Sequence, residues 1–343
     1  MKLLAIETSC DDTAIAILDC SRGRVRVLAE MTASQIPIHR RYGGVVPEVA
    51  ARAHAQTIVP LITEVFESIG LKFSSTGKKP PIDAIAVTCG PGLVTSLWVG
   101  VTTAKTLAWQ WGVPLYGVNH MVGHIFSSLV ERSLPKFPAL ALIVSGGHTE
   151  LVWMKNERSW KKIGSTRDDA AGEAFDKFAK LLGLPYPGGP EISRFALKGD
   201  AGAIEFPRPM IREESFDFSF AGLKTSGRMW IERQQKITPK MRADACASYQ
   251  QAIVDVLISK TKRAAEKLHP KTIILGGGVA ANDALRDALK KQFGSTPGIE
   301  LIIPEKRFTT DNAAMIGAAA FFTGTKFKTS WRSLVANPAF EIQ

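Results

Sequence analysis

The sequence contains the same structural plan twice, and this repeat constrains the fold more than any other feature of the chain. Each copy begins with two apolar segments around a polar turn and ends with an apolar segment, a Gly-rich turn and a helical pattern. The first copy begins at residues 2–19 and ends at 83–111, and the second begins at 139–154 and ends at 272–291. Such patterns predict β-hairpins followed by strand–turn–helix units. We therefore expect a duplicated α/β architecture.

The length of 343 residues suits two domains of ordinary size. We expect an N-terminal lobe over 1–118, completed by a C-terminal helix at about 312–343. The C-terminal lobe would cover 119–311, with an irregular insertion at about 184–226. The polar turns of both copies would face one central cleft, where Gly-rich turns that open helices suit phosphate groups. Two unrelated α/β domains with ordinary tight turns are the alternative.

The charge balance points to an anionic partner, because 43 Lys and Arg stand against 32 Asp and Glu, a formal charge of +11. A hydrophobic content of 45% excludes a largely disordered chain. No run of about 18 apolar residues is present, and the N-terminus resembles neither a secretory signal nor a transit peptide. The four cysteines form no CxxC pair, which is typical of reduced thiols. We expect a cytoplasmic protein without a membrane segment.

Two histidines have the spacing of metal ligands. His120 and His124 stand at i and i+4, so a helix would present both rings on one face. Asp311, at the start of an apolar helix, is the best third ligand, although Thr310 or Asp311 could equally serve as the N-cap. Such a set suits Fe(II), with Zn(II) as the alternative. Met121 stands where zinc proteases carry their Glu, which weakens a peptidase interpretation, and surface or capping histidines remain the simpler alternative.

Other polar residues are candidates for substrate contacts. Glu173 and Asp176 lie near one face of a predicted helix, and Asp176 is the better candidate for contacting a ribose or an amine. Gly277, in a triple-Gly turn, and Asn282 resemble a phosphate or adenosine cradle. Asp11 lies in the first polar turn and is a candidate base, although a simple polar turn is an equal alternative.

Ten blocks spread over nearly the full length carry a resemblance to a known family. They are AIETSCDDT (5–13), YGGVVPEVA (42–50), GPGLVTSLWVG (90–100), HMVGH (120–124), LIVSGGHTEL (142–151), DDAAGEAFDKFAKLLGLPYPGGP (168–190), FPRPM (206–210), FSFAGLKT (218–225), GGGVAAN (276–282) and TDNAAMIG (310–317). The chain resembles the universal tRNA threonylcarbamoyladenosine transferase family in its bacterial, TsaD-like branch.

The resemblance implies a fold and a set of site residues. The fold would be the duplicated actin, sugar-kinase and heat-shock-ATPase fold, with two lobes around a central cleft. One divalent metal would be bound by His120, His124 and Asp311. Substrate binding is implied for Ile143, Val144, Ser145, Gly146, Gly147, Asp176, Gly189 and Asn282.

The resemblance also implies an acyltransferase activity. The threonylcarbamoyl group of L-threonylcarbamoyl-AMP, made by a separate synthase, would pass to N6 of the adenosine 3′ of the anticodon, in tRNAs that read codons beginning with A. AMP would leave. We expect metal-assisted acyl transfer, for which Asp11, Glu173 and His148 are the candidate general bases. TsaB-like and TsaE-like accessory proteins, and a homodimer formed through helices of the first half, are the expected partners.

Two positions indicate the branch. Archaeal and eukaryotic relatives carry Tyr where Ile143 stands and Asn where His148 stands, so the chain groups with the bacterial and organellar members. We expect the bacterial cytoplasm rather than an organelle. The alternatives are an ATP-dependent kinase or ATPase on the same fold, with Asp11 as base, and a non-catalytic scaffold that binds tRNA or a partner protein. The candidate tRNA contacts are Arg40, Arg41, Arg52, Arg167 and Lys224.

Overall fold

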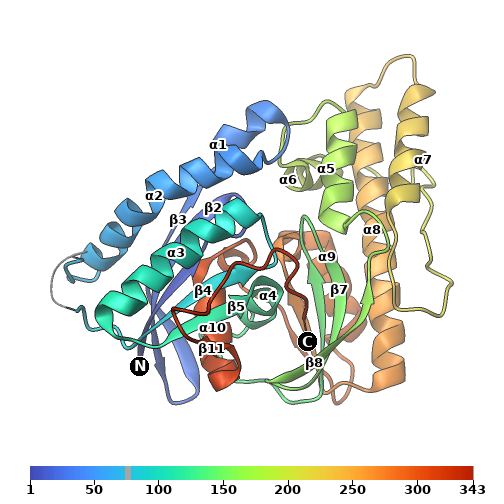
Figure 1. Ribbon diagram of the computed structural model, residues 1–343. Helices are drawn as coiled ribbons and strands as arrows, with labels where there is room; N and C mark the ends of the chain where they lie inside the picture. Colours follow the sequence, from blue (N-terminus) through green and yellow to red (C-terminus); the bar gives the residue numbers. More distant parts are fainter. Residues whose placement is uncertain (74–78, 343) are drawn as a thin grey trace. The chain divides into compact units, whose positions relative to one another are not determined.

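The computed structural model describes residues 1–73 and 79–342 and divides into two compact units (Figure 1). Unit 1 contains Met1–Pro135, Glu157–Ser159 and Pro304–Gln343. Unit 2 contains Lys136–Asn156 and Trp160–Ile303. Each unit is built on one β-sheet with helices packed against it.

The sheet of unit 1 has six strands in the order β11-β5-β4-β1-β2-β3. β1 pairs antiparallel with β2 and parallel with β4, which in turn is parallel to β5. The bounds are β1 Lys2–Glu7, β2 Asp12–Ser21, β3 Arg24–Ser34, β4 Ala84–Gly90, β5 Leu115–Asn119 and β11 Lys328–Thr329. The predicted first hairpin is therefore confirmed.

The sheet of unit 2 has five strands in the order β10-β9-β6-β7-β8. β6 pairs antiparallel with β7 and parallel with β9, which is parallel to β10. The bounds are β6 Ala139–Val144, β7 Thr149–Asn156, β8 Ser159–Ser165, β9 Thr272–Gly276 and β10 Glu300–Ile302. Apart from β11, the two sheets have the same strand order and orientation, which confirms the duplicated α/β architecture.

Helices cover both faces of the unit 1 sheet, because the strand side chains alternate between two apolar layers. Leu4 and Ile6 of β1 pack in the core with α2 and α3, whereas Leu3 and Ala5 lie against Gly317 of α10. The helices are α1 Ile36–His39, α2 Pro47–Glu67, α3 Val94–Trp111, α4 His120–Ser127 and α10 Ala313–Thr323 in unit 1. Unit 2 contains α5 Ala171–Leu181, α6 Gly188–Ala196, α7 Ala221–Glu232, α8 Pro239–Leu268 and α9 Asp283–Phe293.

The structure differs from the sequence-based expectation in three places. The segment 184–226 is not irregular throughout, since it contains α6 and the start of α7. The C-terminal helix spans only Ala313–Thr323, and the chain beyond it continues through β11 into an extended segment. The expected C-terminal lobe of 119–311 includes α4 and Asp311, but the contacts place both in unit 1, because α4 packs against α10.

Within residues 1–73 and 79–342, no helix combines the length and the apolar character needed to cross a membrane.

Candidate metal centre

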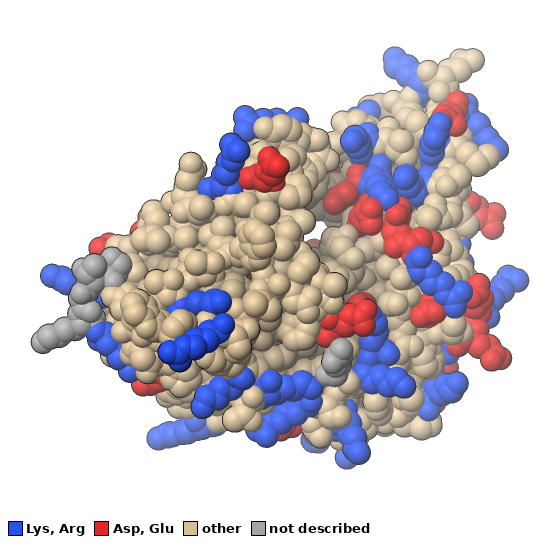
Figure 2. Space-filling view, viewed as in Figure 1, with Lys and Arg blue, Asp and Glu red and all other residues tan. Residues whose placement is uncertain are grey.

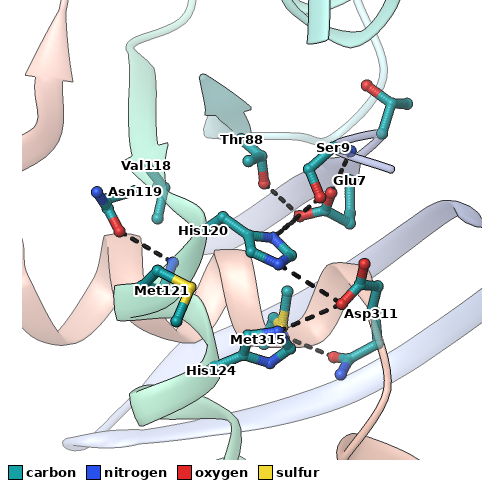
Figure 3. A network of polar contacts seen from close by, with 12 residues as sticks. Glu7, Ser9, Thr88, Val118, Asn119, His120, Met121, His124, Asp311 and Met315 are labelled. Carbon is teal, nitrogen blue, oxygen red and sulfur yellow. Dashed lines mark hydrogen bonds and ion pairs between the residues drawn. The ribbon is translucent and has the colours of Figure 1, made fainter. Parts of the chain in front are cut away.

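The two histidines are placed by a capped helix that follows β5 directly. The side-chain oxygen of Asn119 accepts hydrogen bonds from the backbone N–H groups of Met121 (2.9 Å) and Val122 (3.1 Å), which is typical of an N-cap. His120 is the first residue of α4 and His124 lies one turn later, with ring centroids 4.6 Å apart (Figure 3). The helical spacing predicted for this pair is therefore present.

The third candidate ligand comes from the turn before α10. Asn312, rather than Thr310 or Asp311, caps this helix, because its side-chain oxygen accepts the backbone N–H of Met315 at 2.9 Å. The carboxylate of Asp311 faces the histidines instead, with Oδ1 at 3.6 Å from Nε2 of His120 and 3.3 Å from Nε2 of His124 (Figure 3). One potential ligand atom from each of the three residues lies within 4.8 Å of the others.

These three residues fit a divalent metal. Two imidazoles and one carboxylate are a ligand set that iron and zinc accept. Nε2 of His124, which lies 3.3 Å from Oδ1 of Asp311, is buried and makes no hydrogen bond among the described residues, and an unsatisfied buried nitrogen is costly. Burial and the neighbouring His120 lower the pKa of His124, which keeps this imidazole in the neutral form that binds metal.

His120 differs from His124 in its electrostatic surroundings. Burial opposes the charged form of His120, but the carboxylates of Asp311 and Glu7 outweigh this effect and raise the pKa to about 9. The negative charge that would favour a proton on His120 would equally favour a cation between His120, His124 and Asp311.

Glu7 is a site residue that the sequence analysis missed. It is the last residue of β1, it is fully buried, and its Oε2 lies 3.1 Å from Nδ1 of His120. The available signal was its position in the AIETSC block, where a charged residue follows a buried strand. A buried carboxylate requires partners, and these lie around His120.

The first hairpin turn lies close to the same site. Burial and the charge of Asp311 raise the pKa of Asp11, and burial above all raises the pKa of Asp12 to about 7. The turn is held to α2 by His54, whose Nε2–H donates to the carbonyl oxygen of Cys10 at 3.0 Å. The hydroxyl of Thr13 donates to Nδ1 of the same ring at 2.7 Å. Asp11 therefore stands beside the metal ligands in a braced turn.

In unit 2, Ser145, Gly146, Gly147 and His148 form the β6–β7 turn, and Gly277 lies against the end of β6. The backbone N–H of Ser145 donates to the carbonyl oxygen of His148 at 2.8 Å, and the N–H of His148 donates to Oγ of Ser145 at 3.1 Å. Gly277 has a φ of +89°, and a Cβ there would lie 2.4 Å from the carbonyl oxygen of Val144, so only glycine fits. A Cβ at Gly146 or Gly147 would meet nothing within 4 Å, which leaves the turn open.

The side chains of Ile143 and Val144 are fully buried in β6. Any contact of these two residues with a substrate would therefore come from the backbone. Gly189 is open in the same sense as Gly146, since a Cβ there would meet nothing within 4 Å.

Three polar candidates of unit 2 have structural partners. Glu173 forms an ion pair with Lys177 (2.7 Å) on α5. Asp176 accepts the backbone N–H of Gly188 at 2.7 Å and so fixes the start of α6. Asn282 caps α9 by accepting the N–H of Leu285, and its amide nitrogen donates to Oγ of Ser193 (2.9 Å) and to Oε1 of Gln250 (2.7 Å). These roles position the turns that carry the substrate candidates.

The predicted residues fall into two groups. The structure brings His120, His124, Asp311 and Asp11 together in unit 1. Glu173, His148 and the substrate candidates belong to unit 2. Their roles in catalysis and in substrate binding stay predictions.

The duplicated sheets place the protein in the class of actin-like ATPase folds, here with a His–His–Asp cluster. HypF from T. kodakarensis is similar in fold, with a TM-score of 0.60 and 16% identity, covering 95% of this chain and 47% of that one. Component A of (R)-2-hydroxyglutaryl-CoA dehydratase from Acidaminococcus fermentans gives a TM-score of 0.53 at 14% identity, covering 94% and 98%. These similarities confirm the fold class.

Sequence comparison then identifies the family. A family profile described as tRNA N6-adenosine threonylcarbamoyltransferase matches residues 26–318. Proteins of that name are 49% identical in Moorella thermoacetica, over 93% of this chain and 91% of the relative, and 48% identical in Bacillus subtilis, over 100% and 96%. The chain belongs to the tRNA N6-adenosine threonylcarbamoyltransferase family.

Proposed function

We propose that this protein transfers the threonylcarbamoyl group from L-threonylcarbamoyl-AMP to N6 of the adenosine 3′ of the anticodon, in tRNAs that read codons beginning with A. The observation that carries this function is the family match, which covers residues 26–318. The enzyme is an acyltransferase, and AMP is its second product. The kinase and scaffold alternatives are not favoured by this family.

We propose Fe(II), with Zn(II) as the alternative, as the ion held by His120, His124 and Asp311. When bound, such an ion orients and polarises phosphate oxygens. The fit of the ligand set and the buried Nε2 of His124, which faces Asp311, support this assignment.

Positioning is the main catalytic contribution of the chain itself, because adenine N6 is a weak nucleophile. The open turn Ser145–Gly146–Gly147 would lie against the carbamoyl or phosphate group, and the backbone N–H groups of Gly146 and Gly147 would stabilise negative charge in the transition state. Asp11, Glu173 and His148 are the candidate bases that accept the proton from N6. Asp11 is favoured among them because burial raises its pKa toward neutrality.

The function can be tested by reconstitution. Purified protein is incubated with unmodified tRNA, the synthase, threonine, bicarbonate, ATP and accessory proteins, and threonylcarbamoyladenosine is measured. We expect modification by the native chain and its loss in the His120→Ala/His124→Ala double variant. ATP turnover without tRNA, unaffected by the double variant, would support the kinase alternative instead.

We propose that tRNA contacts a basic surface on α7 and the start of α8. Residues 221–242 contain six Lys and Arg but one acidic residue, Glu232. Figure 2 shows this excess as blue side chains over the end of unit 2 that carries α7. The basic residues are Lys224, Arg228, Arg233, Lys236, Lys240 and Arg242.

The salt dependence of tRNA binding tests this surface. Each lost phosphate contact should reduce the slope of log affinity against log salt by about 1. We expect a lower slope in the Arg233→Gln/Lys236→Gln double variant, since both side chains are exposed. The matched control is Lys290→Gln/Lys291→Gln on α9. Equal slopes in both variants would remove α7 and α8 from the tRNA-binding surface.

We propose that partner proteins dock on the outer face of α2 and α3. Val59, Trp98 and Trp109 are 50%, 58% and 62% exposed, and the surface over these helices is largely uncharged (Figure 2). Such a patch is typical of a protein interface. We assign it to the homodimer, so Trp98→Lys should reduce the mass measured by light scattering. A TsaB-like partner would be indicated if the mass changed only in a mixture with that protein.

The proposed location of the enzyme is the bacterial cytoplasm.

A further inference from the structure

We propose that Glu7 is a positioning residue that fixes the ring orientation and the tautomer of His120 for metal binding. This inference rests on the proposed metal centre and extends it to a carboxylate that contacts a proposed ligand but would not itself bind the ion. Three contacts around Glu7 carry the argument.

The carboxylate of Glu7 is itself held firmly. The residue ends β1, between β2 and β4, and is fully buried. Oε1 accepts the backbone N–H of Ser9 at 2.5 Å, and Oε2 accepts the hydroxyl of Thr88 at 2.5 Å (Figure 3). Because these donors come from the hairpin turn and from β4, the carboxylate has a defined position before any metal binds.

The same carboxylate determines which nitrogen of His120 carries the proton. Oε2 of Glu7 lies 3.1 Å from Nδ1 of His120, and a carboxylate oxygen can only accept. In the neutral ring that can bind a metal, Nδ1 therefore carries the proton, which Oγ of Ser9 also faces at 3.1 Å, and Nε2 keeps its lone pair. Nε2 is the nitrogen that lies 3.6 Å from Oδ1 of Asp311, on the side where the metal would bind. A carboxylate behind a ligating histidine in this way orients the ring and raises its basicity.

His124 provides an internal comparison. Its Nδ1 has no hydrogen-bond partner among the described residues, so no side chain there fixes its tautomer. The two rings consequently differ in preorganisation, and His120 is the ligand that is oriented in advance. A change at Glu7 should weaken metal binding through His120, even though all three ligands are retained.

This role is tested by titrating the protein with Co²⁺ and measuring binding by calorimetry and by visible absorption. We expect Glu7→Gln to raise the dissociation constant by about 10- to 100-fold and to alter the Co²⁺ spectrum. Thr88→Val, which removes one donor to Glu7 and keeps the shape of the side chain, should act in the same direction but less strongly. The matched control is Thr261→Val on α8, which removes a buried hydroxyl hydrogen bond to the carbonyl oxygen of Leu257 in unit 2, the unit that contains none of the three proposed ligands. It should leave both the affinity and the spectrum unchanged.

The outcomes separate this role from the metal centre itself. If the native protein bound no Co²⁺, the proposed metal centre would fail, and the role of Glu7 with it. If the native protein and Glu7→Gln bound Co²⁺ equally, with the same spectrum, only the role of Glu7 would be overturned. Should circular dichroism show that Glu7→Gln is unfolded, Thr88→Val decides: native-like affinity and spectrum would overturn the proposal, and weaker binding with a changed spectrum would support it.

Discussion

Burial governs the chemistry of single residues throughout this protein, and the cysteine thiols illustrate it. Burial raises the pKa of Cys20, Cys89 and Cys246 to about 12, and burial followed by the charge of Asp11 also raises the pKa of Cys10. Because the thiolate is the reactive form, a buried thiol of this kind is inert.

We predict that the thiols of the folded protein react slowly at pH 8. With a pKa of about 12, roughly one thiol in 10⁴ is ionised at this pH, compared with about a quarter for an ordinary thiol. Reaction with Ellman's reagent should be slow in buffer. In the control, protein unfolded in guanidinium chloride at about 6 M, all four cysteines should react rapidly. Rapid reaction of several thiols in the native state would contradict the prediction.

The cap of α10 is a second feature of residue scale. Removal of the Asn312 side chain leaves the N–H of Met315 without its acceptor, so Asn312→Ala should lower the free energy of unfolding by about 1 kcal/mol. Urea unfolding followed by circular dichroism measures this change. Asn312→Asp keeps an acceptor at the same position and is the control, for which we expect a smaller loss.

At the scale of elements, the sequence predicted the helices and strands whose residues follow a clear local periodicity. Strand and helix periodicity was sufficient for both hairpins and for α2, α3 and α8. The helix α6 was missed because Pro187, Gly188 and Gly189 surround its start, and these residues are typical of turns. Its start is fixed by Asp176, which lies on another helix.

Candidate site residues were predictable where ligand chemistry and spacing coincide, as for His120 and His124. Asp311 was predicted as a ligand. The sequence alone did not show that its neighbour Asn312 is the residue that caps α10. For Glu7 the only signal was its place in the AIETSC block, and its contacts with Thr88 and His120 were not predictable because they join residues that are far apart in the chain.

The extended C-terminal segment braces the helix that carries the histidines. The amide nitrogen of Asn119 donates to the carbonyl oxygen of Phe340 at 2.7 Å, while its oxygen caps α4. The N–H of Asn337 donates to the carbonyl oxygen of Cys89 at 2.7 Å. A Cβ at Gly90 would overlap Asn337, so this segment lies directly against the end of β4.

We predict that a chain ending at Ala336 loses both thermal stability and metal affinity. Asn119 would then cap α4 without its anchor to Phe340, and the ring of His120 would be held less precisely. Differential scanning fluorimetry and Co²⁺ titration measure the two effects. A chain ending at Glu341 keeps both contacts and should behave like the native protein. Unchanged Co²⁺ affinity in the shorter chain would show that α4 needs no such brace.

At the scale of the whole molecule, the three proposed ligands all belong to unit 1. Metal should therefore protect unit 1 selectively from hydrogen exchange, since a ligand stabilises the state that binds it by RT ln(1 + [L]/Kd), or about 2.7 kcal/mol at 100 times Kd. We expect slower exchange in α4, α10 and β1 on addition of Zn²⁺ and faster exchange after chelation. The strands of unit 2 serve as the internal reference, and protection of equal size there would contradict the assignment.

The placement of Asp311 has a topological consequence. Apart from the short segment Glu157–Ser159, the chain leaves unit 1 after Pro135, shortly beyond α4, and returns at Pro304, shortly before Asp311. A metal held by His124 and Asp311 would therefore close a loop that contains all of unit 2. Closing so long a loop restricts the unfolded chain, as a disulfide does. The ion would thus act as a reversible cross-link between the chain segments that precede and follow unit 2, and its loss would free the connections at Pro135 and Pro304 at once.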